Sequence, residues 1–216
     1  GMKVSRLSTS AAELRDGHAS AWNRVEENTL MLSPSPIALT ESVSPYMSRT
    51  TGHGKVDRLN VRMAHDGATL SLRLSWPDPD RDDELTDLDQ FADAIAVMFP
   101  LSLDASAFTM GSAEHPVNAW LWRADEEKPF DVIAAGYATS TRRPANSSGL
   151  IVTSSHDGNI WVVVLQRSMK VDGHGYIEIK AGTDLGIAFA VWEGSNRERS
   201  AAKAVSGEFT RISVDA

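Results

Sequence analysis

Two side chains in this sequence can each donate a lone pair to a metal ion. Met110 is followed by Gly111, and its thioether is a soft, neutral ligand. Lys203 can act as a ligand only as the neutral amine, so burial or a metal must first displace its proton. Each residue also has a simpler interpretation, because methionine often fills irregular gaps in a core and a lone lysine is most often a solvated surface charge. The two residues alone leave both interpretations open.

The segments that carry these residues are predicted to be loops joined to β-strands. Hydrophobic residues alternate with polar ones from Val56 onwards, and Asp66-Gly67 predicts a hairpin turn between two such strands. The alternation is typical of antiparallel strands with one solvated face. Further strands are predicted at Ala92–Phe99, Val117–Arg123, Phe130–Tyr137, Leu150–Thr153, Ile160–Arg167, Tyr176–Lys180, Ile187–Trp192 and Glu208–Val214.

This spacing of strands predicts an all-β fold, an antiparallel β-sandwich of the immunoglobulin-like kind. Short peripheral helices are expected at Ala11–Arg15 and Ser20–Val25. No internal repeat and no low-complexity linker divides the chain. We therefore predict one domain overall, in which residues 1–55 form an N-terminal extension that packs on a sandwich of residues 56–216.

Composition excludes several classes of function. The chain has 216 residues and a net charge of −8, which argues against binding to nucleic acid or to anionic membrane surfaces. It has no cysteine, which excludes disulfides, thiolate zinc sites, iron–sulfur clusters and covalent haem attachment. No apolar run approaches the ~20 residues of a membrane span. The first ten residues show no apolar stretch typical of a signal peptide.

Other residues offer weaker signals. The six histidines are scattered without the spacing of a zinc enzyme, although His115 lies close enough to Met110 to compete with it as a ligand. Asp78, Asp80 and Asp82 mimic the start of a calcium loop, but Asp83 replaces the expected glycine and Asp89 stands where glutamate is usual. A solvated acidic loop is the better interpretation of this run.

Several segments, in the same order, resemble one known family. The resemblance spans roughly Val56 to Val214, and its agreement across separate segments makes it specific. The family is that of the haem b-binding gamma subunits of ethylbenzene dehydrogenase and dimethylsulfide dehydrogenase type molybdoenzymes. The matching motifs are the hairpin Asn60–Gly67 with Leu70–Asp78, then Asp93-Ala-Ile-Ala-Val-Met-Phe-Pro100, Met110-Gly111, Val117-Asn-Ala-Trp-Leu-Trp122, Ile187–Trp192, Gly194 to Arg199, and Lys203-Ala-Val-Ser206.

The resemblance implies a DOMON-like sandwich that holds haem b non-covalently between Met110 and Lys203. It implies a periplasmic electron-transfer subunit with no catalytic reaction of its own. Its partners would be a molybdenum-containing catalytic subunit, an iron–sulfur subunit and a soluble electron carrier. Further cofactor-binding candidates are residues that flank the two ligands or could pair with a propionate, namely Gly111, Trp120, Trp192, Arg197 and Arg199.

Two alternatives stay open at this point. Six tryptophans are many for this length, and although most are expected in the core, exposed tryptophan faces on a β-sandwich would indicate a carbohydrate-binding module or another ligand-binding module without haem. The chain could also have kept the family fold and lost the cofactor. Arg197 and Arg199 could equally be solvated loop charges.

Overall fold

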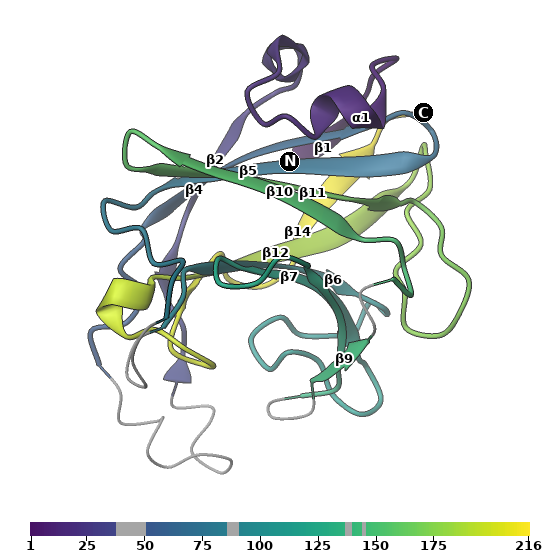
Figure 1. The fold of residues 1–216 in the computed structure, drawn as a ribbon. Coiled ribbons are helices and arrows are strands. Elements are labelled where there is room, and N and C mark those ends of the chain that lie inside the picture. The colour runs from purple at the N-terminus through teal and green to yellow at the C-terminus, as the bar shows by residue number, and fades with distance from the viewer. Residues whose placement is uncertain (38–50, 86–90, 137–139, 144–145) are drawn as a thin grey trace.

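The strands lie in two layers that face one another across a shared core (Figure 1). The computed structural model describes residues 1–37, 51–85, 91–136, 140–143 and 146–216. The first layer holds β10 (Ile151–Asp157), β11 (Ile160–Ser168), β5 (Thr69–Pro77), β4 (Arg58–His65), β2 (Asn28–Met31) and β1 (Met2–Arg6). The second holds β14 (Thr210–Val214), β12 (Asp184–Trp192), β6 (Ala94–Pro100), β7 (Val117–Arg123), β8 (Phe130–Ala134) and β9 (Thr141–Arg143), with β13 (Ala204–Val205) and β3 (Ser33–Pro34) at its edge.

The two layers are joined through one continuous hydrogen-bonded path. Strand β1 pairs with β4 of the first layer and with β14 of the second, and both pairings are parallel. The prediction of an all-β sandwich is confirmed, but the sheet is mixed where we expected only antiparallel pairing. The reason is that β1 enters from the chain start and is not part of a hairpin, so nothing forces it to run against its neighbours.

Alternation along the strands divides the side chains between two faces. On β6, Ile95, Val97 and Phe99 point into the core between the layers, whereas the residues between them point outward. Tryptophans fill one end of this core: the Trp122 ring lies 6.2 Å from Trp76 and 4.9 Å from Trp161. The expectation that most tryptophans are core residues is confirmed.

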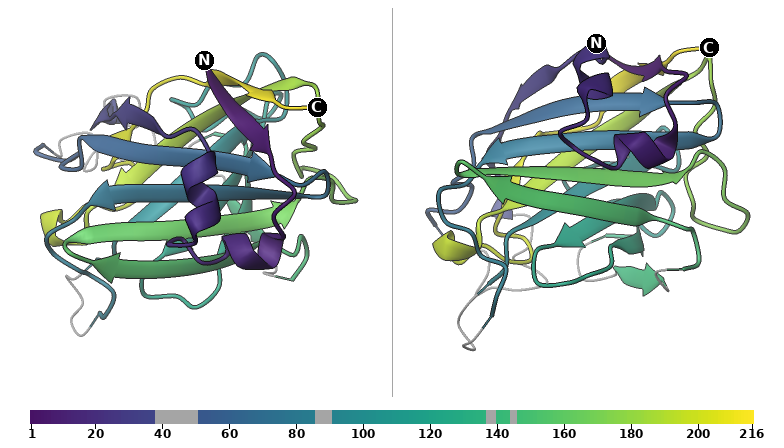
Figure 2. Two further views of the ribbon diagram at one scale, coloured as in Figure 1. Left: turned by 90° about the horizontal axis from the view of Figure 1, so that it is seen from above. Right: turned by 45° about the horizontal axis from the view of Figure 1, so that its top comes forward.

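Two short helices cover the outer face of the first layer, as Figure 2 shows. They are α1 (Ala11–Leu14) and the 3-10 helix η1 (Ser20–Arg24), both close to their predicted positions. Leu14 and Trp22 pack there with Ala64 of β4 and Val164 of β11. The segment 1–37 also contributes β1, β2 and β3 to the sheets, while the domain division at residue 55 stays a prediction.

Most predicted strands are present, and one is not. The Asp66-Gly67 hairpin joins β4 to β5, and β7 has the bounds that the sequence predicts. The predicted strand Tyr176–Lys180 is wrong. Its backbone bonds to side chains, since Ile177 N–H donates to the Asn118 Oδ1 atom at 3.0 Å and Ile177 C=O accepts from the Arg167 guanidinium. The predicted strand Phe130–Tyr137 ends early, at Ala134, and Tyr137 itself lies outside the described residues.

Five short strands, β1, β2, β3, β9 and β13, were not predicted from the sequence. Each is five residues or shorter and has too few alternating positions to give a pattern. No helix in the described part of the chain has the length and apolar character that crossing a membrane requires.

The tryptophan end of the core predicts a specific stability effect. Trp122→Ala should lower the free energy of unfolding by about 3–5 kcal/mol, because it opens a cavity between Trp76 and Trp161 that the two sheets cannot close. Leu103→Ala, at a fully exposed side chain, is the control and should change it by less than about 0.5 kcal/mol. Urea denaturation followed by fluorescence measures both, and equal effects would contradict this account of the core.

Candidate functional site

The outer face of the second layer carries small apolar side chains where a β-sandwich would ordinarily show polar ones. Ala96 and Met98 of β6 lie beside Ala188 and Ala190 of β12, and all four are buried. Together with Lys203 they line a small cleft, open to solvent, with a volume of about 30 Å³. Its lining is almost wholly apolar, so the cleft suits a flat, apolar ligand with a few polar anchors.

One wall of the cleft is the loop between β6 and β7, which carries Met110. Met110 has a φ of 56°, a left-handed conformation that non-glycine residues rarely adopt, and Gly111 follows with a φ of 78°. The Met110 C=O accepts a hydrogen bond from Gly136 N–H at 3.0 Å. A Cβ atom on Gly111 would lie 2.7 Å from the His115 carbonyl oxygen, so only glycine fits this turn.

The facing wall carries Lys203, one residue before β13. Ser35 fixes its backbone from both sides: Ser35 N–H donates to Lys203 C=O at 2.9 Å, and Lys203 N–H donates to the Ser35 Oγ atom at 3.3 Å. Pairing of β13 with both β3 and β12 then holds the segment against the sheet. The lysine side chain is therefore directed into the cleft with only 6% of the residue exposed.

The structure brings the two predicted ligands together. The Lys203 Nζ atom lies 3.8 Å from the Met110 Sδ atom, although 93 residues separate them in sequence. The ammonium also lies 5.0 Å from the centre of the Trp192 ring, and the Trp192 Nε1–H donates to Ser200 C=O at 3.0 Å. Trp192 thus packs on the Lys203 side chain and also bonds to the loop that carries Lys203.

Glu208 connects the two walls. Its Oε2 atom accepts from the Ser106 hydroxyl at 2.7 Å and its Oε1 atom accepts from Ala107 N–H. Ser106 C=O in turn accepts from Gly111 N–H at 2.8 Å. A carboxylate three residues after β13 therefore sets the position of the loop that presents Met110.

Lys203 has an altered proton affinity. Burial in the apolar cleft lowers the pKa of its ammonium to about 8. No carboxylate forms an ion pair with Lys203 in the part of the chain that the structure describes. Because no acid partner holds its proton, the buried Lys203 ammonium can become a neutral amine. A neutral amine beside the Met110 thioether forms a soft donor pair for a metal ion.

The structure places the other candidate residues in different surroundings. Arg197 and Arg199 lie exposed on the loop before Lys203, and the Arg199 guanidinium stacks on the Phe91 ring at 4.9 Å. Trp120 lies on the opposite, inner face of its strand, 4.8 Å from the Phe99 ring, so the structure does not bring it to the cleft. His115 bonds through Nδ1 to the Ser102 hydroxyl at 2.9 Å.

Sequence reasoning missed the supporting residues Ser35 and Glu208 and the alanine-lined face. The sequence does contain a signal for this face, because alanine occupies every second position of two strands, at Ala94, Ala96, Ala188 and Ala190.

The interpretation of the acidic run was wrong for one residue. Asp78 was interpreted as part of a solvated loop, yet it is completely buried, because its side chain turns inward beside Asp93 and Glu193. Asp89 lies outside the described residues.

Comparison with known proteins gives one family match. The family described as ethylbenzene dehydrogenase matches residues 19–155. A protein named as a respiratory nitrate reductase haem subunit from Haloferax mediterranei is 34% identical over 86% of this chain and 63% of its own length. The gamma subunit of chlorate reductase from Ideonella dechloratans is 28% identical over 95% of this chain and 82% of its own. The gamma subunit of dimethylsulfide dehydrogenase from Rhodovulum sulfidophilum is 32% identical over 73% of this chain and 62% of its own.

Solved structures resemble the chain in fold. A protein described as carbohydrate-binding from Bacteroides uniformis superposes with a TM-score of 0.60 and 11% identity over 99% of this chain and 98% of its own. A family 9 carbohydrate-binding module from Caldicellulosiruptor kristjanssonii, solved with glucose, gives 0.53 and 14% over 100% of this chain and 95% of its own. At this identity the likeness shows the shared β-sandwich fold.

The buried lysine predicts a pH-dependent stability in the ligand-free chain. The folded chain releases the Lys203 proton near pH 8, whereas the unfolded chain keeps it up to about 10.4, so the unfolded state binds more protons in between and stability rises with pH across that window. The shift from 10.5 to about 8 corresponds to on the order of 3 kcal/mol.

Lys203→Met should therefore be more stable than the wild type at pH 7, with the difference shrinking between pH 8 and 10.5. Lys180→Met, at an exposed lysine, is the matched control and should track the wild type. Denaturant unfolding across pH measures the difference, and parallel curves for Lys203→Met and wild type would show that burial of the ammonium is not costly.

Proposed function

This chain belongs to the family described as ethylbenzene dehydrogenase, and we propose that it binds haem b and transfers single electrons as the gamma subunit of an oxidoreductase complex. The observation that carries the proposal is the approach of Lys203 Nζ to Met110 Sδ at 3.8 Å, where Lys203 lines an alanine-rich cleft. The relatives named above are gamma or haem subunits of oxidoreductases, so the chain corresponds to a subunit of that kind and not to a catalytic subunit.

The donor set fits a haem iron. With no cysteine in the chain, haem would be held non-covalently, by side-chain ligands and its pocket alone. Met110 and Lys203 would hold the iron, since their donor atoms already lie 3.8 Å apart. Ala96, Ala188 and Ala190 leave the flat space beside them that larger side chains would fill.

Each residue of the site has a task in this proposal. Haem supplies a one-electron redox centre, and the thioether of Met110 favours its reduced state and raises its potential. Lys203 binds as the neutral amine, which its buried environment favours. Trp192 keeps the lysine side chain in place and excludes water from it. Arg197 and Arg199 lie on the adjacent exposed loop, where a guanidinium can pair with a propionate.

The partners that we propose follow from the relatives. Catalytic subunits of the molybdoenzyme type with an iron–sulfur subunit would exchange electrons with this chain, and a soluble carrier would connect it to other redox proteins. The chain spans 63% and 62% of two of the relatives, so their substrates are not transferred to it. We propose the periplasm as its location, which fractionation of cells that produce the native protein would test.

The carbohydrate-binding alternative is less well supported. All six tryptophans lie in the described part of the chain, and none of them is exposed. Sugar stacking on a β-sandwich needs an exposed aromatic face, and the tryptophans of this chain do not form one.

Haem binding is tested by reconstitution. The chain incubated with haem should show a Soret band with a shape typical of six-coordinate low-spin iron.

Met110→Ala should lower the reduction potential, because the thioether no longer favours reduced iron, while the fold is kept. Lys203→Ala should weaken haem retention about 10-fold or more. Met31→Ala and Lys180→Ala, at exposed residues, are the controls. If both site variants keep the wild-type spectrum, Met110 and Lys203 are not the ligands of the haem iron.

Acid should detach Lys203 before it detaches Met110. The amine gains a proton as the pH falls, whereas the thioether has no proton to gain in this range. We expect a reversible spectral change in the oxidised haem-loaded protein at low pH, well before it unfolds, and its absence in Lys203→Met. The measurement is an optical titration monitored alongside far-UV circular dichroism. The same change in the Lys203→Met variant would assign the transition to another group.

A further inference from the structure

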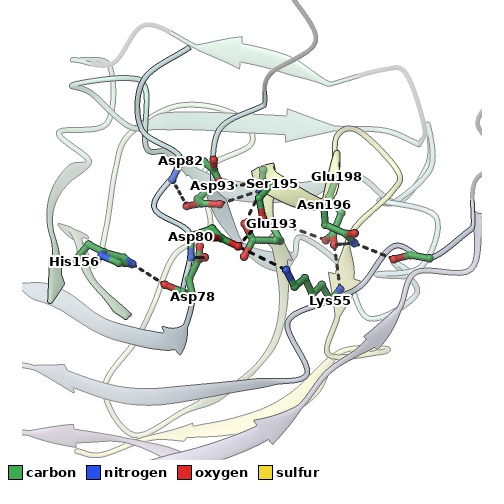
Figure 3. Close-up of polar contacts among 12 residues, drawn as sticks. Lys55, Asp78, Asp80, Asp82, Asp93, His156, Glu193, Ser195, Asn196 and Glu198 are labelled. Atoms are coloured by element: carbon green, nitrogen blue, oxygen red, sulfur yellow. Dashed lines mark hydrogen bonds and ion pairs between the residues drawn. The ribbon is translucent and has the colours of Figure 1, made fainter. Parts of the chain in front are cut away.

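Three carboxyl groups lie buried together at one end of the sandwich. Asp78 follows β5, Asp93 precedes β6 and Glu193 follows β12, and these residues are 0%, 0% and 1% exposed. One oxygen from each lies within 4.8 Å of the others. Figure 3 shows the three side chains directed toward one another from three separate segments.

The protein holds these carboxyl groups in fixed orientations with uncharged donors. Asp93 accepts three hydrogen bonds, from Gly194 N–H at 2.9 Å, Asp82 N–H at 2.8 Å and the Trp161 indole at 3.0 Å. The Glu193 Oε1 atom accepts from the Ser195 hydroxyl at 2.9 Å. A carboxylate has about four acceptor positions, and the remaining one on Asp93 faces the carboxyl groups of Asp78 and Glu193.

The cluster lacks a positive charge. Among the described residues, no lysine, arginine or histidine forms an ion pair with Asp78, Asp93 or Glu193, and the nearby Lys55 pairs instead with Asp80 at 3.8 Å. The Asp78 Oδ1 atom accepts from Asp80 N–H at 3.0 Å, whereas the fully buried Oδ2 atom meets no donor apart from the carboxyl groups of the cluster itself. An unpartnered buried carboxylate oxygen is costly and needs a specific explanation.

We propose that Asp78, Asp93 and Glu193 bind a divalent cation, Ca²⁺, which supplies the charge that the cluster lacks. The ligand set consists of carboxylate oxygens alone, which selects a hard cation over zinc or copper. Ca²⁺ accepts irregular arrangements of oxygens, whereas Mg²⁺ requires near-octahedral geometry and retains several waters, which a buried cluster has little room to hold.

The alternative occupant is a proton. Burial raises the pKa of Glu193 to about 10 and that of Asp78 to about 7. The neighbouring Asp93 adds to both shifts, whereas a hydrogen bond with the Glu193 carboxyl opposes the shift of Asp78. Without a cation, the cluster therefore has to keep protons that ordinary carboxyl groups lose. A cation and these protons compete for the same oxygens, so the experiment must separate them.

The position of the cluster gives the cation a structural role. Glu193 begins the segment that ends at Lys203, and its neighbour Gly194 passes so close to Phe91 that an added Cβ would lie 2.0 Å from the Phe91 carbonyl oxygen. Ser195 N–H bonds to the Asp82 carboxylate at 2.9 Å. A bound cation would join this turn to the segments beside β5 and β6 and so fix one end of the segment that carries Lys203.

The test uses the full chain without haem, stripped with a chelator and confirmed as folded by circular dichroism. CaCl₂ at about 100 times its Kd should raise the Tm by roughly 5–10 °C, and MgCl₂ should raise it less. Tb³⁺, a luminescent substitute for Ca²⁺, should show emission sensitised by Trp161, which donates directly to the cluster, and Ca²⁺ should displace it.

Variants separate the cation from the proton. Glu193→Gln and Asp78→Asn should each lower Ca²⁺ affinity at least 10-fold, and Glu193→Gln should raise the Tm of the stripped chain by removing one buried acid. Asp184→Asn, at an exposed ion pair with Arg211, is the control and should bind as the wild type does. If the stripped wild type is folded, and neither Ca²⁺ nor Mg²⁺ changes its Tm and Tb³⁺ shows no sensitised emission, the cluster holds protons and the proposal is wrong.

Discussion

The two-sided character of β12 is the constraint on which the rest of the molecule depends. Its inward residues, Phe189 and Val191, help to hold the two layers of the sandwich together. Its outward residues, Ala188 and Ala190, leave the space that becomes the cleft. A strand places successive side chains on opposite faces, so the same nine residues build the core and keep the outer face open. A large side chain at either alanine would fill the cleft and leave the core unchanged.

The cleft concentrates features that are unfavourable for a protein without a ligand. Met110 and Ser200 have positive φ angles, and Lys203 is buried without an acid partner among the described residues. Each such feature costs free energy and persists only where surrounding structure enforces it. Ser35 and Glu208 provide that enforcement, because they bond to the backbone of the two loops and leave the side chains of Met110 and Lys203 directed at one another. Strain of this kind is typical of a site prepared for a ligand.

The sequence predicts those strands whose hydrophobic and polar residues alternate locally. It mispredicts a strand where side chains distant in sequence bond to the backbone in place of a neighbouring strand. The strand Val117–Arg123 was predicted with its observed bounds because its pattern is complete in itself. Tyr176–Lys180 has a similar pattern, but Asn118 and Arg167 take its backbone groups, and no local pattern reports such a contact. Resemblance to a family identified Met110 and Lys203. It could not place Trp120, since the face of a strand that a tryptophan occupies depends on register.

The segment from Glu193 to Lys203 connects the two unusual regions of this sandwich. At its first residues, backbone N–H groups bond to buried carboxylates, and at its last, Ser35 and β13 fix the backbone. Trp192, directly before this segment, donates to Ser200 C=O and packs against the Lys203 ammonium. The geometry at Lys203 thus depends on contacts at both ends of a short irregular segment, and a change at the carboxyl cluster can reach the lysine through the backbone. A solved β-sandwich that shares the fold at 11% identity shows that the sheets accept many sequences, so the chemistry of this chain resides in particular side chains that the sheets and their loops hold in place.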